Sequence, residues 1–165
     1  MKLTRLSQPD FVAAGLPPDT SRFLASDTHP IPNLDILIQP VDNFFDFDVP
    51  ADASNVTGLW TENADPTIMW DRAGKREFVR MYHDDAGFHL VADTLQQLLA
   101  DVFMRYHELE SLDAPDEPEF HRLMCNMGAY IGFRGSNELF DLLTNFTDDT
   151  SFDTDLAALL GKLNS

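Results

Sequence analysis

The sequence has one cysteine, few basic residues and no long apolar run, and each shortage excludes a class of protein. A lone Cys125 excludes an intramolecular disulfide framework and a cysteine-based zinc site, and it is expected to pack as a small apolar residue. No stretch approaches the ~20 apolar residues of a membrane span. Residues 1–15 lack the continuous apolar run of a secretory signal, so we expect a cytoplasmic protein.

Basic residues are scarce, because 11 Lys and Arg face 28 Asp and Glu, for a net charge of −17 at pH 7. The excess is spread out: residues 1–60 carry three basic and eight acidic residues, 61–110 five and ten, and 111–165 three and ten. Because phosphates attract Lys and Arg, this charge opposes binding to nucleic acid or to an anionic membrane. It favours solubility and fast capture of a basic protein partner.

Apolar residues are plentiful despite the charge: they make up 44% of the chain and include 13 Phe and 2 Trp, enough for a folded core. Two short helices are expected within residues 9–25, separated by a Gly-Leu-Pro-Pro break, and residues 42–55 form an acidic loop. Strands are predicted where apolar residues alternate: 34–41, 56–61, 67–71, 77–83 and 87–91. Gly74 suits a short hairpin loop, and 77–83 has the pattern of a half-buried strand.

The clearest helix follows Asp93, which forms a predicted capping box with Gln96. Its apolar residues recur at helical spacing: Leu95, Leu98, Leu99, Val102, Phe103, Tyr106 and Leu109. Three more helices are predicted at about 118–130, 136–146 and 153–163, with Ser136 capping the second and Asp153 or Thr154 the third.

Strands grouped ahead of helices predict an α+β fold, with an antiparallel sheet of about four to six strands flanked by helices. An additional helical segment is expected at the C-terminus. We assign residues 1–112 to the α+β core and residues 113–165 to a helical extension packed on the same domain.

The loop at 42–52 combines phenylalanines with aspartates, the composition of a binding surface for a basic protein. Its candidate partner-binding residues are Asp42, Phe44, Phe45, Asp46, Phe47, Asp48 and Asp52. The alternative is that one or two of these phenylalanines pack into the core. The loop lacks the central glycine and closing glutamate of a helix–loop–helix calcium site.

Catalytic patterns are weak. His83 and His89 bracket Asp84 and Asp85, a set that can bind a divalent metal, although a structural turn explains the same residues. Neither a nucleophile elbow nor a phosphate-binding glycine loop is present. We therefore expect no enzyme, cofactor or metal. The alternatives left open are a metal-dependent enzyme or regulator using these four residues, and an adaptor that uses its C-terminal helices.

Three segments carry a resemblance to a known family. FVAAGLPPDTSRFL, TIMWDRAGKREFVRMYHD and FHLVADTLQQLLADVF resemble, in this order, elements of SUKH-superfamily (SMI1/KNR4-like) proteins over about residues 9–110. The asparagine-glycine segment usual in that family is not evident, and the last 50 residues have no counterpart in it. The resemblance implies an α+β fold and an immunity protein that neutralises a cognate bacterial polymorphic toxin, such as a nuclease or a deaminase. It supplies no catalytic residues.

Overall fold

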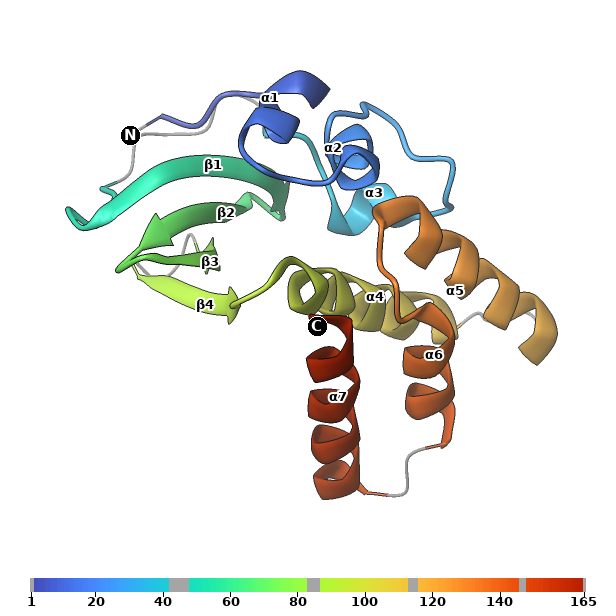
Figure 1. Cartoon of the computed structure of the whole chain (residues 1–165). Helices are drawn as coiled ribbons and strands as arrows, with labels where there is room; N and C mark the ends of the chain where they lie inside the picture. Colours follow the sequence, from blue (N-terminus) through green and yellow to red (C-terminus); the bar gives the residue numbers. More distant parts are fainter. Residues whose placement is uncertain (1, 42–47, 83–86, 113–115, 146–147, 165) are drawn as a thin grey trace. The chain divides into compact units, whose positions relative to one another are not determined.

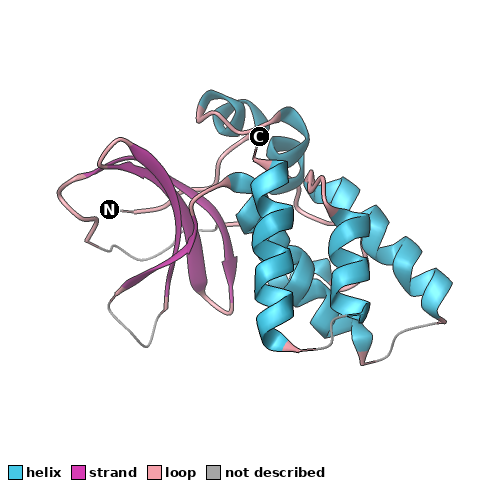
Figure 2. Cartoon of the chain, turned by 60° about the horizontal axis from the view of Figure 1, so that its bottom comes forward, coloured by secondary structure: helices cyan, strands magenta, loops and turns pink. Residues whose placement is uncertain are grey.

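The computed structural model describes residues 2–41, 48–82, 87–112, 116–145 and 148–164. The chain divides into two compact units, an N-terminal unit of Met1–Leu95 and a C-terminal unit of Gln96–Ser165. Figures 1 and 2 show a sheet with short helices in the first unit and long helices in the second. The fold is therefore α+β with an additional helical C-terminal segment, as predicted.

The N-terminal unit is built on a four-stranded antiparallel sheet in the order β1-β2-β3-β4. Its elements are α1 (Gln8–Ala13), α2 (Pro18–Leu24), α3 (Leu34–Leu37), β1 (Ala53–Glu62), β2 (Asp65–Arg72), β3 (Lys75–Met81) and β4 (Phe88–Ala92). The strands predicted from residue 56 onward are confirmed, and so is the hairpin at Gly74. Ala73 and Gly74 have φ of 49° and 76°, the positive values of a two-residue turn whose twist matches the strands.

The strand predicted at 34–41 is wrong. Residues 34–37 form the single helical turn α3, and only Gln39 then pairs with a strand, through Thr61 of β1. Leu34 and Leu37 are buried and Ile36 is 49% exposed, which is the spacing of a helical turn. Four residues are too few for periodicity to distinguish a turn of helix from a strand.

The half-buried pattern predicted for the strand at 77–83 is also wrong, because β3 buries residues of both its faces. Val79 and Met81 join a core cluster with Ile68 and Trp70 of β2. On the alternate positions Phe78 is 1% exposed and Arg80 is 7% exposed. The Arg80 guanidinium lies 3.9 Å from the Glu62 carboxylate, so this buried charge has a counter-ion.

The C-terminal unit consists of four long helices among its described residues. They are α4 (Leu95–Ser111), α5 (Glu117–Ile131), α6 (Ser136–Asn145) and α7 (Asp149–Leu163). All four were predicted, with ends that differ by a few residues. The division between the two units lies in the first turn of α4, whereas the assignment made from the sequence placed a boundary at the other end of this helix, after residue 112.

The helix ends differ from the predicted caps. α7 begins four residues early, because Asp148 accepts a hydrogen bond from the Ser151 backbone N–H at 2.8 Å. Ser136 is the first residue of α6, and its hydroxyl donates to the Phe133 carbonyl. The Gln96 side chain bonds the turn after α5, donating to Gly132 and accepting from Arg134, and this replaces its predicted capping role.

Candidate functional site

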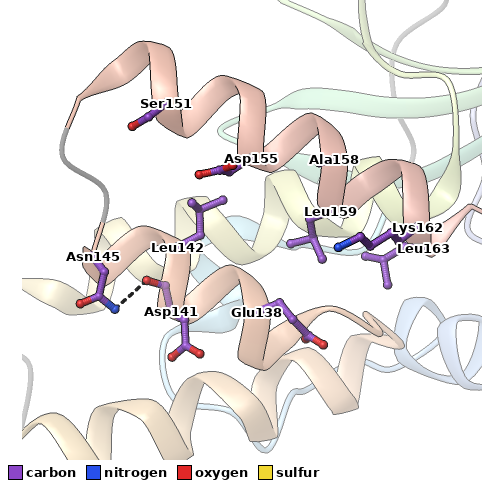
Figure 3. A pocket seen from close by; sticks show the side chains of 10 residues that line it. All are labelled: Glu138, Asp141, Leu142, Asn145, Ser151, Asp155, Ala158, Leu159, Lys162 and Leu163. Atoms are coloured by element: carbon purple, nitrogen blue, oxygen red, sulfur yellow. Dashed lines mark hydrogen bonds between the residues drawn. The ribbon is translucent and has the colours of Figure 1, made fainter.

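The strongest candidate site is the groove between α6 and α7, which we call the α6–α7 groove. It has a volume of about 680 Å³ and lies along two helices that run in opposite directions (Figure 3). Its apolar lining is Leu142 from α6 with Ala158, Leu159 and Leu163 from α7. Leu142 and Leu159 point toward one another from the two helices (Figure 3). The groove therefore offers a strip of leucine that is open to solvent.

The wall formed by α6 is held by close packing on α5. Leu139 and Phe140 of α6 are buried. At Gly128 of α5 an added Cβ would lie 1.9 Å from the Ser136 hydroxyl oxygen, so the two helices meet where only glycine fits. The first turn of α6, which carries Glu138 of the groove, is thus fixed against α5.

The wall formed by α7 is packed more loosely. None of its described side chains is fully buried, although Leu156, Leu159, Leu160 and Leu163 all lie on it. Its C-terminal end is held at the turn before α6, where Gly135 leaves space for Leu163 and the Arg134 guanidinium donates to the Leu163 carbonyl. Each of these leucines therefore keeps part of its side chain exposed.

Three acidic residues belong to the helices of the groove, although Figure 3 shows the Asp141 carboxylate pointing away from α7. Glu138 and Asp141 belong to α6 and Asp155 belongs to α7, and all three are exposed. Among the described residues that line the groove, Lys162 is the basic one. The whole C-terminal unit carries 13 acidic and four basic residues. Two of those four lie within 4 Å of a carboxylate of their own helix: Arg105 is 3.8 Å from Asp101 and Arg122 is 3.5 Å from Glu119.

The predicted partner-binding loop is only partly placed. Asp42, Phe44, Phe45, Asp46 and Phe47 lie outside the described residues. Asp48 is exposed.

Asp52, the last member of the predicted set, pairs with a cation of the sheet. Its carboxylate accepts a hydrogen bond from Arg72 Nε at 2.8 Å, and this bond lowers the pKa of Asp52. Arg72 and Pro50 line a smaller hollow of about 330 Å³ on the sheet, together with Trp70 and Phe88. The charge of Asp52 is thus offset within the unit.

Cys125 belongs to a cluster of side chains on α5 and α6. It is half-buried, and its thiol donates to Asn137 Oδ1 at 3.1 Å. His121 Nε2 lies 3.2 Å from the same oxygen, and its ring stacks on Phe140. Burial, followed by the negative charge of Asp141, raises the pKa of the thiol. The thiolate is the nucleophilic form, so this environment disfavours attack by Cys125.

The metal-binding alternative also falls partly outside the described residues, which exclude His83, Asp84 and Asp85. His89 lies on β4, with its ring centroid 5.1 Å from that of Tyr82. Within the described part of the chain, no three His, Cys, Asp or Glu side chains gather as metal ligands.

His107 of α4 gives the C-terminal unit a pH dependence that can be tested. Its ring lies 5.0 Å from that of Phe120 and 5.8 Å from that of Phe140, and burial lowers its pKa. Below the unfolded value of about 6.5 the unfolded chain therefore binds more protons at this site, so folding stability is lost as the pH falls. As the pH falls from about 7.5 to about 5.5, the unfolding free energy of the wild type should decrease relative to that of His107→Gln. Urea unfolding followed by circular dichroism measures both. Parallel pH profiles would contradict this.

Sequence reasoning missed the α6–α7 groove although it found both helices. The leucines of α7 recur at positions 156, 159, 160 and 163, which is helical spacing and indicates an apolar face. That spacing does not reveal whether the face is covered. The acidic residues beside it were counted in the net charge but not assigned to a surface.

No described helix combines the length and the apolar character needed to span a membrane. No protein-family model, no curated protein and no solved structure matches the chain. The function proposed below is therefore based mainly on the α6–α7 groove and the charge around it.

Proposed function

We propose that this chain is a cytoplasmic immunity protein that binds and neutralises a cognate bacterial polymorphic toxin with a basic surface. The observation that carries the proposal is an open leucine-lined groove in a unit with 13 acidic and four basic residues. Apolar anchors beside an excess of negative charge are what a protein needs to bind a basic partner firmly and selectively.

The charge suits a toxin that acts on nucleic acid, such as a nuclease or a deaminase. Such an enzyme needs Lys and Arg to hold phosphates. An inhibitor with a net charge of −17 is attracted to that surface from a distance, and once bound it competes with the substrate for it. Fast association matters here, because the toxin must be captured before it reaches its substrate.

The resemblance to SUKH-superfamily proteins also supports the proposal. Its first segment runs from the end of α1 through α2, and its second contains most of the hairpin of β2 and β3 with Gly74 in the turn. Its third segment joins β4 to α4. The helices α5, α6 and α7 follow these segments, so the groove would be an addition to the part of the chain that shares the resemblance.

Growth rescue tests the proposed function. The reading frames that adjoin this gene are expressed singly in a sensitive bacterial host, with and without this chain. We expect one of them to stop growth and this chain to restore it. Charge reversal at Glu138 and Asp155 should weaken the rescue. Charge reversal at Asp46 and Asp48 tests the loop at residues 42–52 in the same assay. Killing that persists while this chain is expressed in soluble form, or the lack of any toxic neighbour, would count against the proposal.

A further inference from the structure

We infer that the α6–α7 groove is the docking site for one basic amphipathic helix of the partner. This inference rests on the proposed function and deepens it, because it names the element of the partner that is recognised. Helix-in-groove recognition uses apolar anchors at positions i, i+3 or i+4, and i+7 of the bound helix, laid against an apolar strip.

The shape of the groove fits a helix better than a compact ligand. Its lining extends along the hairpin, from Asn145 and Ser151 near the connection between the helices to Glu138 and Leu163 at the other end (Figure 3). A row of side chains from one helix can therefore contact both α6 and α7. The loose packing of α7, which buries none of its described side chains fully, leaves apolar area that a third helix would cover.

The charge around the groove selects among possible occupants. Glu138 and Asp155 are exposed on the two helices that line the groove, so Lys and Arg flanking an apolar stripe would meet opposite charge. An acidic helix would be repelled. A second copy of this chain is disfavoured for the same reason, since each copy has a net charge of −17.

Synthetic peptides test the inference on the full-length chain. The probe is a fluorescent peptide of about 20 residues, long enough to form a helix, with leucine at helical spacing and lysine on both flanks. Its control carries glutamate in place of every lysine. Fluorescence anisotropy should show binding of the lysine peptide that weakens between about 0.05 M and about 0.3 M salt, and no binding of the glutamate peptide.

A pair of bulky substitutions on one helix locates the binding. Ala158 lines the groove, whereas Ala157 does not, and both are exposed on α7. Ala158→Trp should fill the groove and weaken peptide binding by about tenfold or more, and Ala157→Trp should change it less than about twofold. Because neither alanine is buried, both variants should fold as the wild type does.

A pair of charge variants separates the groove from general attraction between opposite charges. The first variant removes three negative charges from residues that line the groove, with Glu138→Gln, Asp141→Asn and Asp155→Asn. The second makes the same change in net charge elsewhere on the unit, with Glu117→Gln, Glu119→Gln and Asp153→Asn, all at exposed positions outside the groove. The groove variant should bind the lysine peptide several-fold more weakly than its matched control, by about threefold or more at low salt.

Three results would overturn the inference. Equal binding by Ala158→Trp and Ala157→Trp would place the peptide elsewhere. An equal loss of peptide binding in the two charge variants would show that the peptide is attracted by net charge alone. Sedimentation that shows self-association abolished by Ala158→Trp would make a second copy the occupant. No toxin is used, so peptide binding can be lost while growth rescue survives, or the reverse, and the two proposals can fail separately.

Discussion

Gly128→Ala is expected to destabilise the C-terminal unit by about 1–3 kcal/mol or more, although the same exchange inside a helix usually stabilises it. The added Cβ would lie 1.9 Å from the Ser136 hydroxyl oxygen, 2.9 Å from the Ser136 Cβ and 3.2 Å from the Phe103 ring. Rotating the buried Ser136 hydroxyl away would break its bond to the Phe133 carbonyl and would leave the Ser136 Cβ at 2.9 Å. α5 and α6 must separate, or the start of α6 must unwind.

Gly161 provides the matched control for this prediction. It also lies within a helix, α7, but nothing lies within 4 Å of the Cβ that alanine would add there. Gly161→Ala should therefore stabilise the chain by about 0.5–1 kcal/mol. If the close contact is the cause at position 128, Ser136→Gly should recover part of the lost stability. Equal stability of the two alanine variants would show that α5 and α6 do not meet as described.

Two signals separate the units during unfolding. Trp60 and Trp70 are the tryptophans of the chain, and both belong to the sheet of the N-terminal unit. The long helices, which dominate far-ultraviolet circular dichroism, belong to the C-terminal unit. Gly128→Ala should shift the circular dichroism transition to lower urea. Tryptophan fluorescence then reports whether the sheet unfolds with the helices or in a transition of its own.

Leu99→Ala should cost about 2–5 kcal/mol of unfolding free energy. Leu99 is 0% exposed on α4, between Leu98 and Ala100, which are also 0% exposed. Removing its isobutyl group loses the transfer free energy of a buried leucine and leaves a cavity among neighbours that cannot fully close it. The spread in the expected cost reflects how far those neighbours relax.

Leu112→Ala is the control for this second prediction. Leu112 follows the end of α4 and is 87% exposed, so its loss should change the free energy of unfolding by less than about 0.5 kcal/mol. Urea unfolding followed by circular dichroism measures both variants. A cost for Leu99→Ala no larger than that for Leu112→Ala would be incompatible with the burial of this face of α4.

Local sequence signals predicted most of the elements. The spacing of Leu98, Leu99 and Val102 predicted α4, and these residues are buried on it. Alternation around Gly74 predicted the β2–β3 hairpin and its turn. These signals are reliable because they repeat over many residues or require a positive φ that glycine adopts readily.

The failures are also local. Residues 34–37 are too few to show a period. They form the helical turn α3, in which Leu34 and Leu37 are both buried. The start of α7 was placed near Thr154 because Ser, Thr and Asp occur throughout residues 148–155, and each can cap a helix. The Asp148 side chain accepts from the Ser151 backbone N–H, and α7 begins at the next residue.

The predicted and the structural candidate sites differ for a related reason. The aspartates and phenylalanines of residues 42–52 are adjacent in the sequence, so composition alone draws attention to them. Glu138, Leu142, Asp155 and Leu159 come from two helices, and only the folded hairpin brings them to one groove. A surface assembled from separate segments leaves no contiguous pattern to recognise.

The sequence by itself determined the net charge of −17, the α+β class and most of the helices and strands, because these depend on composition and on periods within single segments. The tertiary structure alone decided that both faces of β3 are buried, that Gly128 meets Ser136, and that the leucines of α7 stay partly open. Periodicity gives the direction of an apolar face, but what covers that face depends on residues far away in the chain.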